Sequence, residues 1–499
     1  MPRARTTLVV FLSVCLYLGW ISASRVFLDG DNDEGIYMDA ALRILHGQMP
    51  YKDFFAFSGP GSFFLTAASF RIFGITLATA RIPVIFDVAL LTSCVCWLTW
   101  KLSGAAAALA AALAFVSFET LWQGVLVNHR WDSSAWMTLA ATLIFFALDN
   151  STKVEPNRNK SVAACATAGV AATVAVFCTP PVAIAGVALG ACLLFAGRKL
   201  AIAFLAGIAV ATALGAGFLA SHAALAPMIR SMAWTAANYT IANHTSYGWI
   251  IGGYGHLFHG LSTGEAIVTA LVMVFITLPA TLPFVSALWL SKRPPMKIVV
   301  LLTSGAALLL SSYPRWDLIH LNYIAALFYA LAASLIWNFR FRKMVAVTVL
   351  VAAAVCLGTN ARKRLSEPSR MTMLGAAHGP AAGLQTTAML QRQVRPSDTL
   401  FVFPYRPIVY FLTLARNPTR YSFLQPGMFP ESDARQALEE LRSEPPRWMV
   451  YMDIPDSEFL RIWPGSDPSR MRMSGIESFI RERYRKVDQS SDFQLLELR

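Results

Sequence analysis

The sequence predicts an all-α polytopic membrane protein with about eleven transmembrane helices, followed by a small C-terminal α/β soluble domain. Three observations support this fold class: 56% of the 499 residues are hydrophobic, only 14% are charged, and the mean hydropathy is +0.50. Soluble domains are usually about one quarter charged. The composition therefore excludes a cytosolic enzyme and places most of the chain in contact with lipid.

Each expected span is an apolar stretch without Lys or Arg. A span needs about 20 apolar residues, or fewer where flanking side chains reach back to the interface. The expected spans are 7–24, 82–100, 102–121, 133–149, 161–179, 180–197, 200–220, 264–290, 298–313, 318–339 and 344–359.

The charges of the loops predict the orientation, because Lys and Arg collect in cytoplasmic loops. If the N-terminus is cytoplasmic, the basic loops fall on the inner side of the membrane. The excess of 42 basic over 29 acidic residues is therefore interpreted as a consequence of membrane topology. No nucleic-acid partner is expected. The inner basic residues are Lys101, Lys153, Arg158, Lys160, Arg198, Lys199, Lys292, Arg293, Lys297, Arg340, Arg342 and Lys343.

Three segments leave alternatives in this topology. The stretch Gly59–Gly74 is short and is interrupted by Arg71, so we expect it to lie flat at the outer interface or to be partly re-entrant. The span 344–359 has basic residues on both sides, which leaves open whether it crosses. The first span is interpreted as an uncleaved anchor, with a cleaved signal peptide as the alternative.

Three polar regions fall on the outer face, where they can form one site. They are the first external loop (25–81), a long external loop (221–263) and the chain after residue 359. The expected domains are a membrane domain over 1–360, a linker over 361–396 with a helix near Met389, and an α/β domain over 397–499. Its expected strands are 399–403 and 448–452, its helices 408–415 and 434–441, and its closing hairpin 486–498. This domain lacks the GxGxxG, P-loop and HExxH motifs and is interpreted as a packing or acceptor-docking module.

Four carboxylates, Asp29, Asp31, Asp33 and Glu34, follow the first span within six residues. One interpretation is a capped interfacial helix with solvated acids, because Asp31 and Glu34 have capping-box spacing before a helix that ends at Gly47. A calcium loop is disfavoured, because Glu34 and Ala40 stand where such a loop needs Gly and Glu. The functional interpretation is a general base held ionised at a helix N-terminus.

Two further outer helix mouths carry charged groups. Asp132 follows His129 and Arg130, and Arg315 precedes Asp317 and His320. Arginine suits bidentate recognition of phosphate, whereas the structural alternatives are a helix cap with interfacial tryptophans and a snorkelling or ion-paired arginine. Asp87, inside the second span, is a weaker functional candidate.

The long external loop is rich in aromatic and amide side chains, which either bind sugars or form an interfacial belt. Neither the histidines nor the seven cysteines have metal-ligand spacing, so no metal site is expected. The polar and aromatic residues of the long external loop are Arg230, Trp234, Asn238, Tyr239, Asn243, His244, Tyr247, Trp249, His256 and His259.

The spacing of residues in the first external loop resembles that of a known family. The pattern comprises Asp33-Glu34, Tyr37, Ala41, Gly47, Pro50-Tyr51, Asp53, Gly59-Pro60, Phe73-Gly74 and Ala80-Arg81. It resembles the GT-C membrane glycosyltransferases, in the group of the protein O-mannosyltransferases (glycosyltransferase family 39) and the bacterial aminoarabinose and lipopolysaccharide-sugar transferases. Where the mannosyltransferases have Pro-Pro-Leu-Gly-Lys, this chain has Gly59-Pro60-Gly61-Ser62-Phe63. This departure places the bacterial lipid- or glycan-modifying members nearer.

The resemblance implies the roles of individual residues. Asp33 is the expected catalytic base, Glu34 its partner and Asp132 the second acid, while Arg315, with Arg130, would stabilise a leaving phosphate. The full set of expected substrate-binding residues is Arg130, Arg315, His320, Tyr37 and Arg230.

The implied reaction is transfer of a sugar from a polyprenyl-phosphate donor to a lipid, glycan or protein acceptor, with inversion at the anomeric carbon. It implies an enzyme of the bacterial inner (plasma) membrane, with its C-terminal domain periplasmic or extracellular. No cofactor is expected, and a divalent cation is not required. The alternatives are a transporter or flippase, which predicts midplane charges and internal repeats, and an assembly protein without activity.

Overall fold

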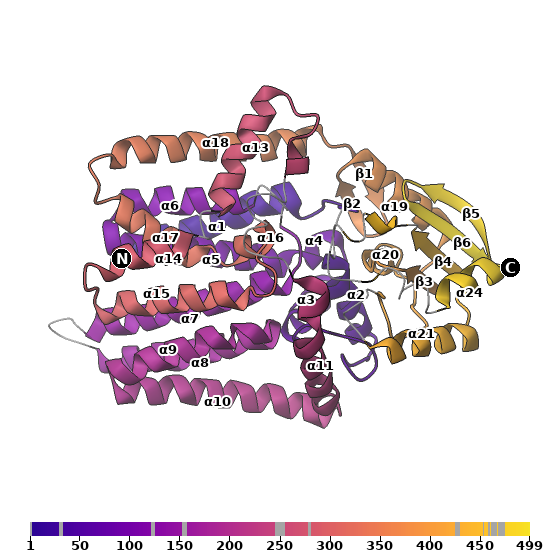
Figure 1. Cartoon of the computed structure of the whole chain (residues 1–499), viewed down its shortest axis with the longest axis horizontal. Helices are drawn as coiled ribbons and strands as arrows, with labels where there is room; N and C mark the ends of the chain where they lie inside the picture. The colour runs from indigo at the N-terminus through magenta and orange to yellow at the C-terminus, as the bar shows by residue number, and fades with distance from the viewer. Residues whose placement is uncertain are drawn as a thin grey trace.

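Long apolar helices form the N-terminal part of the molecule, and a small sheet domain packs at one end of them (Figure 1). The computed structural model describes residues 2–28, 33–120, 125–151, 157–244, 255–277, 281–424, 430–452, 454–457, 460, 467 and 475–499. Asp29 and Asp31, and with them the predicted capping box, lie outside these residues, as do Tyr247 and Trp249.

Within the described residues, six helices are long and apolar enough to cross a membrane, and each coincides with a predicted span. Four shorter apolar helices also lie at predicted spans: α6 (Ala105–Glu119), α9 (Ala183–Ala196), α15 (Met296–Ser311) and α17 (Ala326–Ile336). The protein is therefore a multi-pass helical membrane protein, while the total of eleven crossings stays a prediction. The six long helices are α1 (Pro2–Ser22), α5 (Ile82–Ser103), α7 (His129–Ser151), α8 (Arg158–Cys178), α10 (Arg198–Ser221) and α18 (Arg342–Ser366).

Two predicted spans are each divided into two helices. The stretch 264–290 contains α13 (Thr263–Thr277) and α14 (Leu282–Leu290), and Pro283 lies in the first turn of α14. Proline lacks the N–H that an unbroken helix would need at this position. The stretch 318–339 contains α16 (Leu318–Tyr323) and α17, separated by Ile324 and Ala325.

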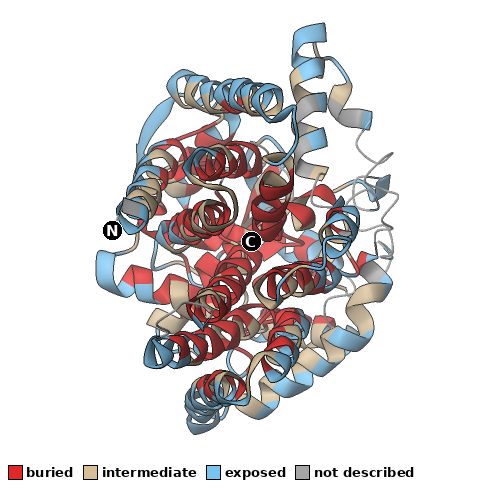
Figure 2. Ribbon diagram, turned by 90° about the vertical axis from the view of Figure 1, so that its left-hand side faces the viewer, coloured by how far each residue is buried: buried red, intermediate tan, exposed pale blue. Residues whose placement is uncertain are grey.

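The burial pattern agrees with a bundle that faces lipid. Buried residues concentrate at the centre of the bundle, and exposed residues lie on the peripheral helices (Figure 2). The outward side chains include Leu16, Phe195 and Leu214, which are 76%, 84% and 71% exposed. An apolar surface of this kind is typical of contact with a membrane.

Short helices lie between the bundle and the C-terminal domain. They are α2 (Glu34–Leu45), α3 (Gly61–Phe73), α4 (Leu77–Ala80) and α11 (Leu225–Asn243), and α11 runs across the ends of the long helices (Figure 1). The stretch Gly59–Gly74 is thus mostly the helix α3. Its first residues approach α8 so closely that a Cβ on Gly59 would lie 2.1 Å from the carbonyl oxygen of Phe177. This close packing is a physical reason for glycine in the Gly59-Pro60-Gly61 sequence.

The C-terminal domain has a four-stranded sheet in the order β3-β4-β6-β5. β3 (Leu400–Phe403) is parallel to β4 (Trp448–Met452), and β6 (Phe493–Leu498) pairs antiparallel with β4 and with β5 (Tyr484–Ser490). The helices α20 (Ile408–Thr413), α21 (Glu431–Ser443) and α24 (Ile476–Arg483) accompany the sheet. The predicted strands, the helices near 408–415 and 434–441 and the closing hairpin are all present.

The predicted linker 361–396 is a folded segment. Helix α18 continues to Ser366, beyond the predicted end at 359, and is followed by the hairpin of β1 (Ser369–Thr372) and β2 (Gly375–His378) and by α19 (Ala381–Gln393). The helix expected near Met389 is therefore confirmed, and the remainder of the segment has more secondary structure than the linker that the sequence predicts. The physical reason is that Leu384, Met389 and Leu390 are buried.

The C-terminal segments and the first external loop lie at the same end of the bundle. The Val26 amide donates to the His378 carbonyl (2.8 Å), the Phe55 amide donates to the Arg420 carbonyl (2.8 Å), and Arg25 pairs with Glu367 (2.6 Å). By contrast, Lys101, near the end of α5, and Lys297, near the start of α15, both contact Asp149 at 2.7 Å. The two lysines belong to loops that the sequence predicts to share the opposite face. The long external loop also contacts the first external loop, because the Ser231 hydroxyl donates to the Ala56 carbonyl (2.6 Å).

Candidate active site

A cavity of about 600 Å³ opens between the first external loop, the starts of α7 and α16, and α11. It is the place where five segments distant in the sequence meet, the fifth being the connection between α8 and α9. Its polar lining includes Asp33, Glu34, Asn128, His129, Arg130, Thr179, Tyr239, Arg315, His320 and Tyr323, and its apolar lining includes Phe57, Ile184, Met232, Leu310 and Ile319.

Asp33 lies at the N-cap position of α2, at the wall of this cavity. Its carboxylate accepts a hydrogen bond from the Tyr405 hydroxyl. Burial raises the pKa of Asp33 above its ordinary value, while the Tyr405 hydrogen bond and the charges of Arg315, His320 and Arg406 act in the opposite direction. Asp33 therefore stands at the helix N-terminus that the sequence predicts, but the raised pKa differs from the expectation that the helix end holds this carboxyl ionised.

Glu34 also reaches the cavity, but it is held by Arg81. The guanidinium contacts both carboxylate oxygens, at 2.7 Å from Nη2 and 3.2 Å from Nε, and both side chains are fully buried. Arg81 also donates to the Ser22 carbonyl at the end of α1. The Glu34 carboxylate therefore links α2 to α1 and α5.

Two arginines contribute positive charge to the same cavity. Arg130, in the first turn of α7, is 8% exposed, and its Nη1 donates to the Ser311 carbonyl (3.1 Å). Its Nε has no hydrogen-bond partner among the residues that the structure describes. Arg315 contacts Asp317 through Nε at 3.0 Å. A buried guanidinium nitrogen without a partner is costly, and an anionic ligand would satisfy it.

Asp317 contacts both Arg315 and His320, and so holds the two cationic side chains next to each other. Asp317 caps α16 by accepting from the His320 amide (3.0 Å), and its Oδ1 also lies 2.7 Å from His320 Nδ1. Burial opposes ionisation of Asp317, but the contacts with His320 and Arg315 outweigh it and lower the pKa of Asp317 below its ordinary value.

Three predicted site residues lie away from the cavity wall. Asp132 is behind the wall, where it accepts from the Ser62 hydroxyl and hydrogen-bonds with Asp87. The ring of Tyr37 is buried between Phe63 and His129, at centroid distances of 5.6 and 5.8 Å.

Arg230 is on the exposed face of α11 and does not line the cavity. The cavity instead uses Tyr239, which is nine residues further along α11 and therefore on the opposite face of the helix. It also uses Thr179, whose hydroxyl is 2.8 Å from His129 Nδ1.

Two tyrosines of this site are not among the predicted residues. Tyr323 lines the cavity from the end of α16, and Tyr405 reaches Asp33 from the C-terminal domain. The available signal for Tyr405 was its position two residues after a buried strand, at the carboxyl end, where ligand-contacting residues of α/β domains often lie.

Comparison with known proteins bears on the fold alone. No protein-family model matches this sequence, and no curated protein matches it significantly. Among solved structures, ArnT from Cupriavidus metallidurans bound to undecaprenyl phosphate is similar, with a TM-score of 0.62, 13% sequence identity and coverage of 98% of this chain and 97% of ArnT. The apo state of ArnT gives a TM-score of 0.58 at 12% identity, covering 99% of this chain and 98% of ArnT.

The archaeal oligosaccharyltransferase AglB from Archaeoglobus fulgidus, in complex with an inhibitory peptide and a dolichol-phosphate, is also similar. Its TM-score is 0.53 at 14% identity, and the match covers 94% of this chain and 72% of AglB. The chain therefore has a GT-C-like membrane fold with a C-terminal sheet domain, as its sequence predicts.

Proposed function

We propose that this protein is an integral membrane glycosyltransferase that moves a sugar from a polyprenyl-phosphate donor to a lipid, glycan or protein acceptor on the extracytoplasmic face. The observation that carries this proposal is a single cavity that combines the carboxylate of Asp33 with the guanidinium groups of Arg130 and Arg315. Two solved proteins of similar fold, whose structures hold undecaprenyl phosphate and dolichol-phosphate, support the class of donor.

The reaction is an inverting single displacement. The acceptor oxygen or nitrogen forms a bond to the anomeric carbon while the bond from that carbon to the phosphate oxygen breaks. The electron pair of the broken bond leaves with polyprenyl phosphate, and the acceptor proton passes to Asp33. The sugar thereby inverts its anomeric configuration.

The cationic side of the cavity stabilises the departing phosphate. Within the described part of the chain, Arg130 has a guanidinium nitrogen without a hydrogen-bond partner, and Arg315 is oriented by Asp317. Preorganised charges aimed at the leaving group usually make the largest contribution to such a rate enhancement. His320 and Tyr239 line the same cavity and complete the polar contacts with phosphate or sugar.

The two remaining acids support the site without reacting. Glu34 anchors the start of α2 through Arg81, and Asp132 holds the start of α3 through Ser62. Tyr37 supports the cavity wall by stacking on His129. The site needs no metal for this mechanism, because two arginines provide the charge that the phosphate requires.

Release of polyprenyl phosphate tests the proposal. Purified wild-type protein in nanodiscs is mixed with each of a panel of polyprenyl-phosphate sugars and an envelope extract that supplies acceptors, and the lipid products are measured by mass spectrometry. A transferase releases polyprenyl phosphate from at least one donor. Movement of intact donor between the leaflets of a vesicle, without release from any donor, would instead show a flippase.

A further inference from the structure

The C-terminal domain reaches directly into the proposed active site through one side chain. Tyr405 lies between β3 and α20, is 1% exposed, and donates its hydroxyl to Oδ1 of Asp33. Its ring packs edge-on against Phe423, with centroids 5.9 Å apart, and the guanidinium carbon of Arg406 is 5.7 Å from the ring centroid. The hydroxyl is therefore held in place by a packed ring.

The helix that begins at Asp33 is fixed to the same domain. A Cβ on Gly35 would lie 2.0 Å from the backbone nitrogen of Ile408, so α2 and the start of α20 are in direct backbone contact. One turn further along α2, Arg43 pairs with Asp39 (3.1 Å) and donates from Nη2 to the Thr419 carbonyl (3.0 Å).

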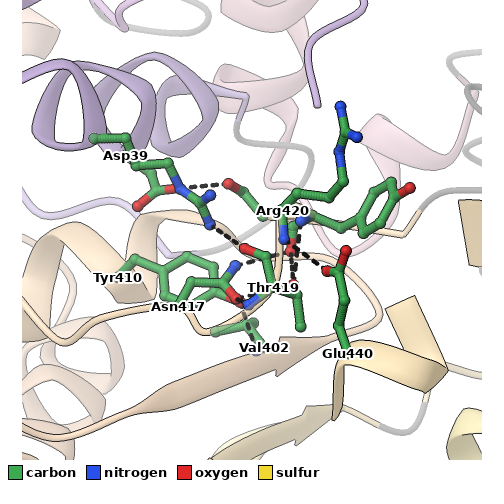
Figure 3. Close-up of polar contacts among 10 residues, drawn as sticks. Asp39, Val402, Tyr410, Asn417, Thr419, Arg420 and Glu440 are labelled. Carbon is green, nitrogen blue, oxygen red and sulfur yellow. Dashed lines mark hydrogen bonds and ion pairs between the residues drawn. The ribbon is translucent and has the colours of Figure 1, made fainter. Parts of the chain in front are cut away.

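The same ion pair receives a second contact from the C-terminal domain. The Ser422 hydroxyl donates to Asp39. Figure 3 shows Asp39 of α2 facing the segment that carries Thr419 and Arg420. The backbone amide of Arg420 donates in turn to the Glu440 carboxylate (3.0 Å). Since Asp39, Arg43, Thr419 and Ser422 are buried and joined by these contacts, they hold α2 against this segment of the C-terminal domain.

The other charged and titratable groups around Asp33 come from the membrane domain and from one neighbour of Tyr405. Their charges influence the protonation of Asp33 together with the Tyr405 hydrogen bond. From the described elements that pack around Asp33 they are Tyr37, Tyr239, Arg315, His320, Tyr323 and Arg406.

We propose that Tyr405 is a positioning residue for the base: its hydroxyl holds one carboxylate oxygen of Asp33 and leaves the other oxygen oriented toward the cavity. The C-terminal domain is then an integral part of the active site and not only a packing or docking module. The inference rests on the proposed function for the role of Asp33 as base, but the contact itself is independent of any sugar donor.

Removal of the Tyr405 hydroxyl has two expected effects. Without the hydrogen bond the carboxylate is less stabilised relative to the acid, so the protonation midpoint of Asp33 moves to higher pH, by about one pH unit. The freed carboxylate also rotates, so kcat falls by about tenfold or more while KM changes little. A side chain with only a packing role would shift neither the midpoint nor the ratio of kcat to KM.

Labelling of Asp33 with a hydrophobic carbodiimide tests this inference without a donor, because the reagent modifies protonated carboxyls. The extent of labelling at Asp33 is followed against pH by peptide mass spectrometry in the full-length protein. The comparison is between wild type, Tyr405→Phe and the control Tyr421→Phe, which removes a hydroxyl that donates to Gln436 in the same domain. Only Tyr405→Phe is expected to move the midpoint upward.

A second variant keeps the test decisive if Tyr405→Phe does not fold. Replacement of Tyr405 by difluorotyrosine strengthens the phenol as a donor, and the midpoint is then expected to move to lower pH. Unchanged midpoints in both variants would overturn the inference. Because labelling reports protonation and not transfer, a failure of the proposed transferase activity would leave this result interpretable.

Discussion

Glu34 and Arg81 form a fully buried, two-point ion pair that joins the helix carrying Asp33 to the start of α5. The neighbouring acids Asp33 and Glu34 therefore do different work. Asp33 is the proposed proton acceptor, whereas Glu34 holds the start of α2 in place through its ion pair with Arg81. Adjacent carboxylates are thus distinguished by their partners and not by their exposure to the cavity.

The ion pair predicts a strong and non-additive effect on stability. Removal of one partner leaves a buried charge uncompensated, so Arg81→Met or Glu34→Gln is expected to lower the stability by about 3 kcal/mol or more. Replacement of both partners removes both charges and is expected to cost less than the sum of the single changes. Thermal unfolding of the wild type, the two single variants and the double variant in the same detergent measures the loss of stability for each. Losses that add up in the double variant would contradict a direct ion pair.

The raised pKa of Asp33 predicts how activity depends on pH. The ordinary value for this carboxyl is 3.8, and burial raises it in the folded protein. Since the base must be ionised, kcat/KM is expected to fall with decreasing pH at a higher pH than an ordinary carboxyl would cause. A pH profile of transfer by the wild-type enzyme checks this, and a constant rate down to pH 4 would contradict the assignment.

The same shift predicts that the base reduces stability. A folded-state pKa above the unfolded value favours the protonated form, so the contribution to stability is present at low pH and is lost as the pH rises through the folded pKa. Asp33→Asn is therefore expected to raise the melting temperature at neutral pH while it abolishes activity, a trade-off common in active sites. Asp492→Asn, on the exposed turn between β5 and β6, is the control and should leave the melting temperature unchanged.

The two cavity arginines are expected to act mainly on the chemical step. Arg315→Ala and Arg130→Ala should each lower kcat about 10²-fold, because each removes charge that meets the leaving phosphate. Arg435→Ala, on the exposed face of α21, is the matched control and should retain wild-type rates. If both cavity variants changed KM alone, the arginines would bind the donor without stabilising its departure.

Gly35 predicts a tight requirement at the contact between α2 and the C-terminal domain. An added methyl group would meet the Ile408 backbone at 2.0 Å, so Gly35→Ala is expected to loosen the domain and lower its protection against proteases. Gly217→Ala in α10 meets nothing within 4 Å and should be tolerated. Limited proteolysis of the two variants in nanodiscs gives the comparison, and equal digestion patterns would contradict the contact.

Much of the architecture could be predicted from local sequence pattern. Runs without Lys or Arg located the long helices, and the alternation of short apolar segments located β3 and β4. Breaks within apolar runs were harder, because nothing in the composition of 318–339 separates α16 from α17. The fold of 361–396 was missed, because its hairpin gains order by pairing Arg25 and Val26 with His378 across a long sequence separation.

The site was predictable where its residues are clustered in the sequence. Asp33, Arg130, Arg315 and His320 were found because charged groups at helix mouths stand out against apolar spans. The position of Tyr405 after a buried strand indicates a ligand-contacting residue but not its partner, because Asp33 is 372 residues away in the sequence. The displacement of Asp132 behind the cavity wall likewise depends on Ser62, 70 residues away.

In the proposed mechanism, Asp33 removes the acceptor proton during transfer from a polyprenyl-phosphate sugar. The most direct measurement compares wild type with Asp33→Asn for donor binding by native mass spectrometry and for release of polyprenyl phosphate in the presence of acceptor. We predict that Asp33→Asn retains the bound donor and loses release by about 10²-fold or more, whereas the Asp492→Asn control matches wild type. Undiminished release from Asp33→Asn would contradict the account and move the base to another group in the cavity.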